Sequence, residues 1–127
     1  MHIDRLDHLV LTVADVERTC KFYQEILGFE PTTFADNRKA LVFGRQKINL
    51  HRLGKEFEPR ALRATAGSAD ICFIATTLLE TVIEELRDKN VAIEVGPVAR
   101  TGALGPMRSV YIRDPDQNLV EISNYDA

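Results

Sequence analysis

Hydrophobic and polar positions along the chain change period several times, and the same order of periods occurs twice. Residues 6–13 alternate like a strand, and apolar positions then recur at helical spacing over residues 16–27. Asp15 is typical of a helix N-cap, and Gly28 is typical of the residue that ends a helix. Three further strand-like runs complete this first part of the chain, at residues 30–34, 39–43 and 47–53.

The second half of the chain repeats that order. A strand is predicted at residues 70–75 and a helix from Leu78 to about Lys89. Thr77 and Glu80 have the spacing of a capping box, in which each side chain binds the other residue's backbone N–H. Three more strands are predicted near residues 92–95, 108–112 and 119–123, with a turn of Asp, Pro and Asn residues before the last.

The repeat predicts an α+β fold of two βαβββ modules within a single domain that spans residues 1–127. Module one covers about residues 3–53 and module two about residues 69–125, and residues 54–68 form a connecting loop. A single module of this size would be marginally stable, so we expect the two to share a core or a dimer surface.

Composition excludes several classes of function. Apolar residues make up 45% and charged residues 28% of the chain, and the net charge of -3 comes from interspersed signs. We therefore expect no nucleic-acid partner and no membrane partner. The beginning of the sequence shows no signal segment, which favours a cytoplasmic location. Cys20 and Cys72 stand among apolar neighbours and are predicted to be buried free thiols.

Candidate metal ligands occupy repeated strand positions. Strand alternation places His8, His51 and Glu121 on the faces opposite the apolar residues of their strands. Aligning the repeats places His8 over Asp70 and His51 over Glu121. Two imidazoles with one or two carboxylates suit Zn, Ni, Mn, Co or Fe(II). Each residue taken alone is an ordinary core or surface residue, whereas the set predicts one divalent metal ion.

Three segments resemble the signatures of the vicinal oxygen chelate superfamily, which includes glyoxalase I and the bleomycin-resistance and fosfomycin-resistance proteins. They are residues 6–13 (LDHLVLTV), 22–29 (FYQEILGF) and 113–121 (RDPDQNLVE). With residues 39–44, 55–59 and 96–102, the chain looks most like the glyoxalase-domain-containing-protein-5 group of this superfamily.

The resemblance implies paired modules that form a cupped mixed sheet around one metal ion, and chains that assemble as homodimers. His8, His51 and Glu121 match ligand positions of the family, whereas Asp70 stands where the family commonly has His. Asp70 is therefore a fourth ligand, a group that orients His51 or a water, or a catalytic base.

The metal chemistry of the superfamily implies a small substrate that chelates the metal through two oxygens, in a lyase, isomerase or thiol-transferase reaction. Glu121 or Asp70 would move the proton. Residues 100–108 combine two glycines with Arg100 and Arg108, which suits an anionic substrate group or a plain loop. Asn49 is a further substrate-binding candidate. The alternatives are a resistance-type protein that sequesters a small molecule, or an Fe(II) extradiol-type dioxygenase.

Overall fold

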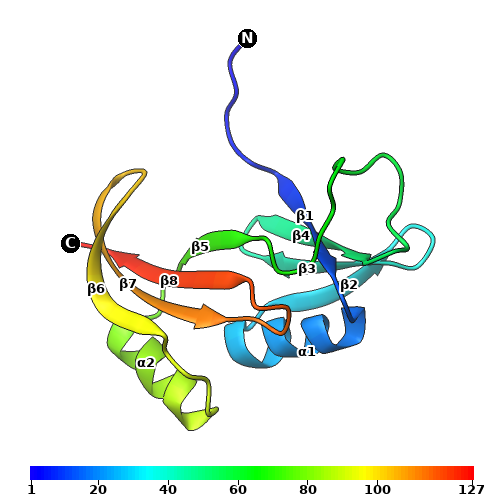
Figure 1. Cartoon of the computed structure of the whole chain (residues 1–127). Helices are drawn as coiled ribbons and strands as arrows, with labels where there is room; N and C mark the ends of the chain where they lie inside the picture. Colours follow the sequence, from blue (N-terminus) through cyan, green and yellow to red (C-terminus); the bar gives the residue numbers. More distant parts are fainter. The chain divides into compact units, whose positions relative to one another are not determined.

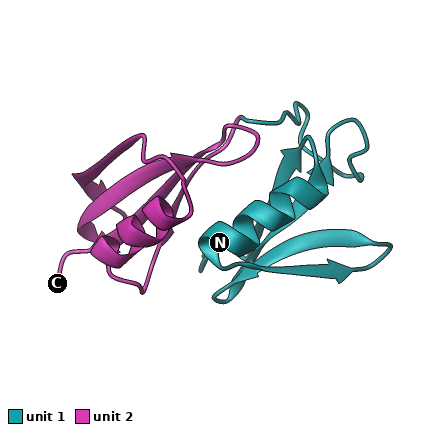
Figure 2. Cartoon of the chain, turned by 90° about the horizontal axis from the view of Figure 1, so that it is seen from below, with its two compact units in different colours: residues 1–67 teal, residues 68–127 magenta.

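The chain, described by a computed structural model over residues 1–127, divides into two compact units, Met1–Gly67 (unit 1) and Ser68–Ala127 (unit 2). Figure 2 colours the two units separately. Each unit contains one helix and a four-stranded sheet in the chain order βαβββ (Figure 1). The predicted α+β fold of two repeated modules is therefore confirmed, and the units divide within the predicted connecting loop.

Both sheets are mixed and have the same topology. In unit 1 the strand order is β1-β4-β3-β2, and in unit 2 it is β5-β8-β7-β6. The first and last strands of each unit pair in parallel, and all other neighbours are antiparallel. The elements of unit 1 are β1 (His8–Val13), α1 (Val16–Leu27), β2 (Glu30–Phe34), β3 (Arg38–Phe43) and β4 (Gln46–Arg52). Those of unit 2 are β5 (Asp70–Ile74), α2 (Leu79–Asp88), β6 (Val95–Gly102), β7 (Gly105–Arg113) and β8 (Leu119–Tyr125).

Helix α1 begins and ends as the sequence predicts. The Asp15 carboxylate accepts a hydrogen bond from the backbone N–H of Arg18 at 3.0 Å, and Gly28 ends the helix with φ at 73°, a left-handed conformation that favours glycine. The helix packs against β2, β3 and β4, so the core of unit 1 lies between the helix and one face of the sheet. Its fully buried side chains include Val13, Tyr23, Leu41 and Ile48.

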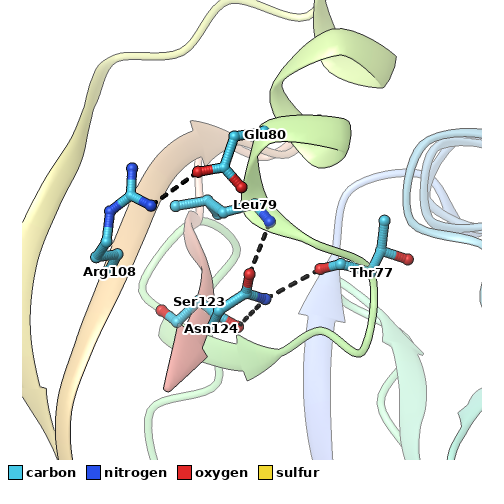
Figure 3. Close-up of polar contacts among 6 residues, drawn as sticks. All are labelled: Thr77, Leu79, Glu80, Arg108, Ser123 and Asn124. Carbon is cyan, nitrogen blue, oxygen red and sulfur yellow. Dashed lines mark hydrogen bonds and ion pairs between the residues drawn. The ribbon is translucent and has the colours of Figure 1, made fainter. Parts of the chain in front are cut away.

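Helix α2 begins differently from the prediction, and the capping box of Thr77 and Glu80 was wrong. The helix has no side-chain cap from its N-cap residue. Instead, Asn124 of β8 accepts a hydrogen bond from the Leu79 N–H at 2.7 Å and donates to the Thr77 carbonyl at 3.0 Å (Figure 3). Glu80 accepts a hydrogen bond from Arg108 at 2.8 Å. A strand residue distant in the sequence therefore caps the helix, which local spacing does not reveal.

The prediction was also wrong for the segment after α2. The expected short strand at residues 92–95 and the expected loop at residues 100–108 are replaced by a long hairpin of β6 and β7. At Gly96, with φ at 111°, a Cβ atom would lie 2.5 Å from the Ser109 carbonyl oxygen. Only glycine permits that close approach of β6 and β7. Gly96 therefore supports their pairing in a segment where apolar and polar residues alternate only weakly.

The structure also bears on two expectations from composition. Neither α1 nor α2 is long and apolar enough to cross a membrane. Both cysteines are free, as expected, but only Cys20 is partly buried. Cys72 is exposed, so its predicted burial was wrong: it lies on the face of the unit 2 sheet opposite the apolar core positions.

Candidate metal centre

The candidate metal ligands lie on the open face of each sheet, by which we mean the face opposite the helix. In β1, Leu11 and Val13 are buried toward the helix, whereas His8 and Val10 are exposed. In β4 the same alternation places Asn49 and His51 on the open face. Alternation from sequence therefore assigned the faces correctly.

The strand register corrects the predicted match between the repeats. His8 pairs with Lys47 in unit 1, and Asp70 pairs with Leu119 in unit 2. If the two units are aligned so that His8 corresponds to Asp70, then their strand partners correspond as well, Lys47 to Leu119. Two residues further along the same strands, Asn49 corresponds to Glu121. The predicted match of His51 with Glu121 was therefore wrong. His51 matches Ser123 instead, because the pairing and not the apolar pattern fixes which residues of two strands meet.

Each unit thus presents one diagonal pair on its open face. His8 and Asn49 form the pair in unit 1, and Asp70 and Glu121 form it in unit 2, each offset by two residues on neighbouring parallel strands. With a rise of about 3.3 Å per residue and a strand spacing of about 4.8 Å, the Cα atoms of such a pair lie about 8 Å apart. His51 is offset from His8 by four residues. Their Cα atoms are therefore about 14 Å apart, which is too far for both imidazoles to bind one ion readily.

His8 is oriented by its neighbour in sequence. Its Nδ1 lies 2.7 Å from the Asp7 carboxylate, and 42% of the His8 side chain is exposed. This hydrogen bond from His8 lowers the pKa of Asp7. A carboxylate bound to Nδ1 favours the tautomer with its proton there, which leaves the lone pair of Nε2 available. His8 therefore has the arrangement commonly seen in metal-binding histidines.

Asn49 carries a buried oxygen atom without a partner. Its side-chain Oδ1 is inaccessible to solvent and accepts no hydrogen bond. In register, Asn49 lies between Val10 of β1 and Ala40 of β3, and Ala40 is fully buried. A buried, unsatisfied acceptor costs about 1–3 kcal/mol, so this oxygen is a candidate for binding a ligand.

His51 lies in a different environment from His8. It is 6% exposed, and its ring contacts the Phe57 ring edge to face at 5.5 Å between centroids. Burial lowers the pKa of His51, and the positive charge of Arg38 lowers it further, while Glu56 and Glu58 act in the opposite direction. His51 is therefore a neutral imidazole at pH 7, able to accept a proton.

Two cations lie on the open face of unit 1. The Arg38 guanidinium is stacked 4.0 Å over the ring of Phe57, and Lys47 Nζ lies 4.0 Å over the ring of Phe34. In register, Arg38 pairs with Phe34 and Lys47 pairs with His8. The aromatic rings hold both charges in place beside Asn49.

Glu121 is held by a buried polar cluster in unit 2. It is 9% exposed, and its Oε2 accepts a hydrogen bond from Ser109 Oγ at 2.6 Å. Ser109 Oγ also lies 2.6 Å from Ser123 Oγ, and Cys72 Sγ lies 3.3 Å from Ser123 Oγ. Although Cys72 is exposed as a whole, partial desolvation raises the pKa of its thiol, and the carboxylates of Glu121 and Asp70 raise it further, while the hydrogen bond with Ser123 acts in the opposite direction. Sequence reasoning missed Ser109, because only the pairing of β7 with β8 brings it to Glu121.

The two candidate substrate-binding arginines lie on opposite faces of the unit 2 sheet. Arg100 donates a hydrogen bond from Nε to the Tyr111 hydroxyl at 2.9 Å, and Tyr111 pairs in register with Glu121 on the open face. Arg108 instead forms an ion pair with Glu80 of α2, on the helix side (Figure 3). Within either unit, no three His, Cys, Asp or Glu side chains are grouped to hold a metal ion.

The chain belongs to the Glyoxalase/Bleomycin resistance protein/Dioxygenase superfamily, whose sequence model matches residues 5–122. It is 58% identical over 125 residues to the virulence protein STM3117 of Salmonella typhimurium, covering 98% of this chain and 87% of that protein. The crystal structure of STM3117 matches with a TM-score of 0.98 over 99% of this chain and all of that chain. Glyoxalase domain-containing protein RDO1 of Mycosarcoma maydis is 47% identical over 98% of this chain and 70% of its own length.

More distant structures share the fold alone. Lactoylglutathione lyase from Agrobacterium tumefaciens matches with a TM-score of 0.74 at 20% identity, over 97% of this chain and 95% of that chain. The fosfomycin resistance protein FosX from Listeria monocytogenes, solved with Mn(II), matches with a TM-score of 0.66 at 22% identity, over 98% and 93% of the two chains. The predicted membership of the glyoxalase and resistance-protein superfamily is thus confirmed, and the fold admits both enzymes and resistance proteins.

Proposed function

We propose that this chain is a divalent-metal-dependent enzyme of the glyoxalase type, acting on a small anionic substrate that presents two neighbouring oxygen atoms. The observation that carries the proposal is the repeated diagonal pair, His8 with Asn49 and Asp70 with Glu121. These four residues offer one imidazole nitrogen and three oxygen ligands. That donor set fits Zn, Ni, Mn, Co or Fe(II).

In this proposal Asn49 replaces His51 as the ligand from β4. Asn49 lies within reach of an ion held by His8, and its buried Oδ1 has no other partner. His51 lies two residues beyond Asn49 on the same face of β4, and we assign its neutral imidazole the role of accepting a proton or a hydrogen bond from the substrate. The family relationship supports a shared site of this kind, and we propose that one metal is bound jointly by the two types of unit in a symmetric homodimer.

The charges favour an anionic substrate. With a neutral amide at position 49, two carboxylates balance the charge of a divalent ion, so the ion and its ligands together are neutral. Arg38 and Lys47 then supply two positive charges on the open face of unit 1. Arg100, held by Tyr111 on the open face of unit 2, is a further cation for an anionic group. Arg108 is not part of the proposal, because Glu80 already binds it.

The chain's own residues supply positioning and proton transfer. When bound, a divalent metal polarises the substrate oxygens and stabilises the negative charge that develops on them. Asp70 is exposed at the start of β5, and if it does not bind the metal it can instead accept a proton from substrate carbon or water. His51 is available for the same role at neutral pH because burial keeps its imidazole uncharged, with a free lone pair. Glu121 is fixed by Ser109 and acts as a ligand.

The test combines metal analysis with a substrate screen. Purified protein should carry close to one divalent ion per chain, and His8→Ala and Glu121→Ala should each remove most of it. Arg108→Ala, on the helix side, is the matched control and should keep the metal. The screen uses a glutathione hemithioacetal and fosfomycin with a thiol, because consumption of substrate separates an enzyme from a sequestering protein. Full metal occupancy in both ligand variants would reject the site.

A further inference from the structure

A line of hydroxyl groups reaches the carboxylate of Glu121 from within unit 2. Ser109 of β7 and Ser123 of β8 are directly opposite each other in the antiparallel pair, and both are fully buried. Their Oγ atoms lie 2.6 Å apart, and Ser109 Oγ lies 2.6 Å from Glu121 Oε2. The direct contact of Ser123 with Oε2 is longer, at 3.4 Å.

The direction of these hydrogen bonds follows from the number of hydrogens. Each serine hydroxyl has one hydrogen to donate. Ser109 donates its hydrogen to Glu121, so the short contact between the serines requires Ser123 to donate to Ser109. The hydrogen bonds therefore run from Ser123 to Ser109 and from Ser109 to Oε2, and each bond polarises the next. Hydrogen bonds from hydroxyls to an ionised carboxylate are about twice as strong as neutral ones.

We infer that Ser109, supported by Ser123, is a positioning residue that occupies Oε2 and makes Glu121 a ligand through Oε1 alone. The inference rests on the proposed function, in which Glu121 binds a metal. The buried hydroxyl competes with the metal for Oε2, so a carboxylate held in this way binds an ion through one oxygen. It also holds the side chain in one rotamer before the metal arrives, which reduces the ordering cost of binding.

The experiment is a titration with Co²⁺, whose visible spectrum reports coordination number. Ser109→Ala removes the donor to Oε2, and Ser123→Ala removes only its support. Tyr111→Phe is the matched control, because it deletes a hydroxyl at the β7 position paired with Glu121 without touching the carboxylate. Ser109→Ala should weaken Co²⁺ binding about 10-fold to 100-fold. Its absorption per bound ion should fall as Oε2 joins the coordination sphere.

Ser123→Ala should change affinity and spectrum in the same direction but less, and Tyr111→Phe should change neither. Wild-type affinity and spectrum in Ser109→Ala would overturn the inference while leaving the proposed metal site intact. A wild-type protein that does not bind Co²⁺ would reject the proposed function and the inference with it. Thermal unfolding shows whether Ser109→Ala folds, and if it does not, the spectrum of Ser123→Ala decides: an unchanged spectrum overturns the inference.

Discussion

The unpartnered oxygen of Asn49 predicts that stability and metal binding oppose each other at this position. Asn49→Leu replaces the amide by an apolar side chain of similar size, facing Val10 and Ala40. The change removes a buried acceptor that has no hydrogen bond in the folded protein. The same change removes an oxygen that we propose as a metal ligand. We therefore expect a protein that is more stable and binds metal less tightly.

The size of the effect follows from the cost of an unsatisfied buried group. Removing that cost should raise the free energy of unfolding by about 1–3 kcal/mol. The control is Asn118→Leu, at a buried asparagine whose partners are present. Its Oδ1 accepts from the Ala69 N–H at 2.8 Å, and its Nδ2 donates to Asp114 at 2.8 Å. Asn118→Leu leaves the Ala69 N–H and the Asp114 carboxylate without these hydrogen bonds, which should lower the free energy of unfolding by roughly 2–6 kcal/mol.

Urea unfolding of the metal-free proteins measures both changes, and metal titration measures the affinity. The same substitution should thus act with opposite sign at the two asparagines, and the melting temperatures should move apart accordingly, by roughly 4 °C per kcal/mol. If Asn49→Leu destabilises the metal-free protein as much as Asn118→Leu does, then the Asn49 Oδ1 has a hydrogen-bond partner within the protein. That result would remove Asn49 from the ligand set.

Four further predictions test the proposed roles. His51→Gln should keep the metal and reduce turnover, and metal analysis showing loss of the ion would restore His51 as a ligand. Folding lowers the pKa of His51, so the unfolded state binds more protons than the folded state just below the ordinary histidine pKa of about 6.5. The free energy of unfolding should therefore fall as the pH drops below that value. Urea midpoints should show a shallower fall in His51→Gln. Asp70→Asn should lower turnover about 100-fold with the metal retained if Asp70 is the base, or lower both together if it is a ligand. Light scattering should show a dimer at micromolar concentration, and a monomer would reject shared ligation between chains.

Local patterns in the sequence determined the elements and their faces. The apolar spacing between Asp15 and Gly28 defined α1 because both ends are set by hydrogen bonds within a few residues. Alternation placed His8 and Glu121 on open faces because side chains in any strand point to alternate sides. The repeated order of elements, together with the motifs, was sufficient to indicate the superfamily that the comparisons confirm.

The tertiary structure alone decided which residues of different strands meet. The parallel pairs β1 with β4 and β5 with β8 join segments that are distant in sequence, so no turn fixes their register. That register replaced His51 by Asn49 as the counterpart of Glu121. The pairing of β7 with β8 brought Ser109 to the Glu121 carboxylate, and the packing of α2 against β8 let Asn124 cap the helix in place of Thr77. Such contacts depend on the assembled sheet, whereas a single segment encodes only its own conformation and faces.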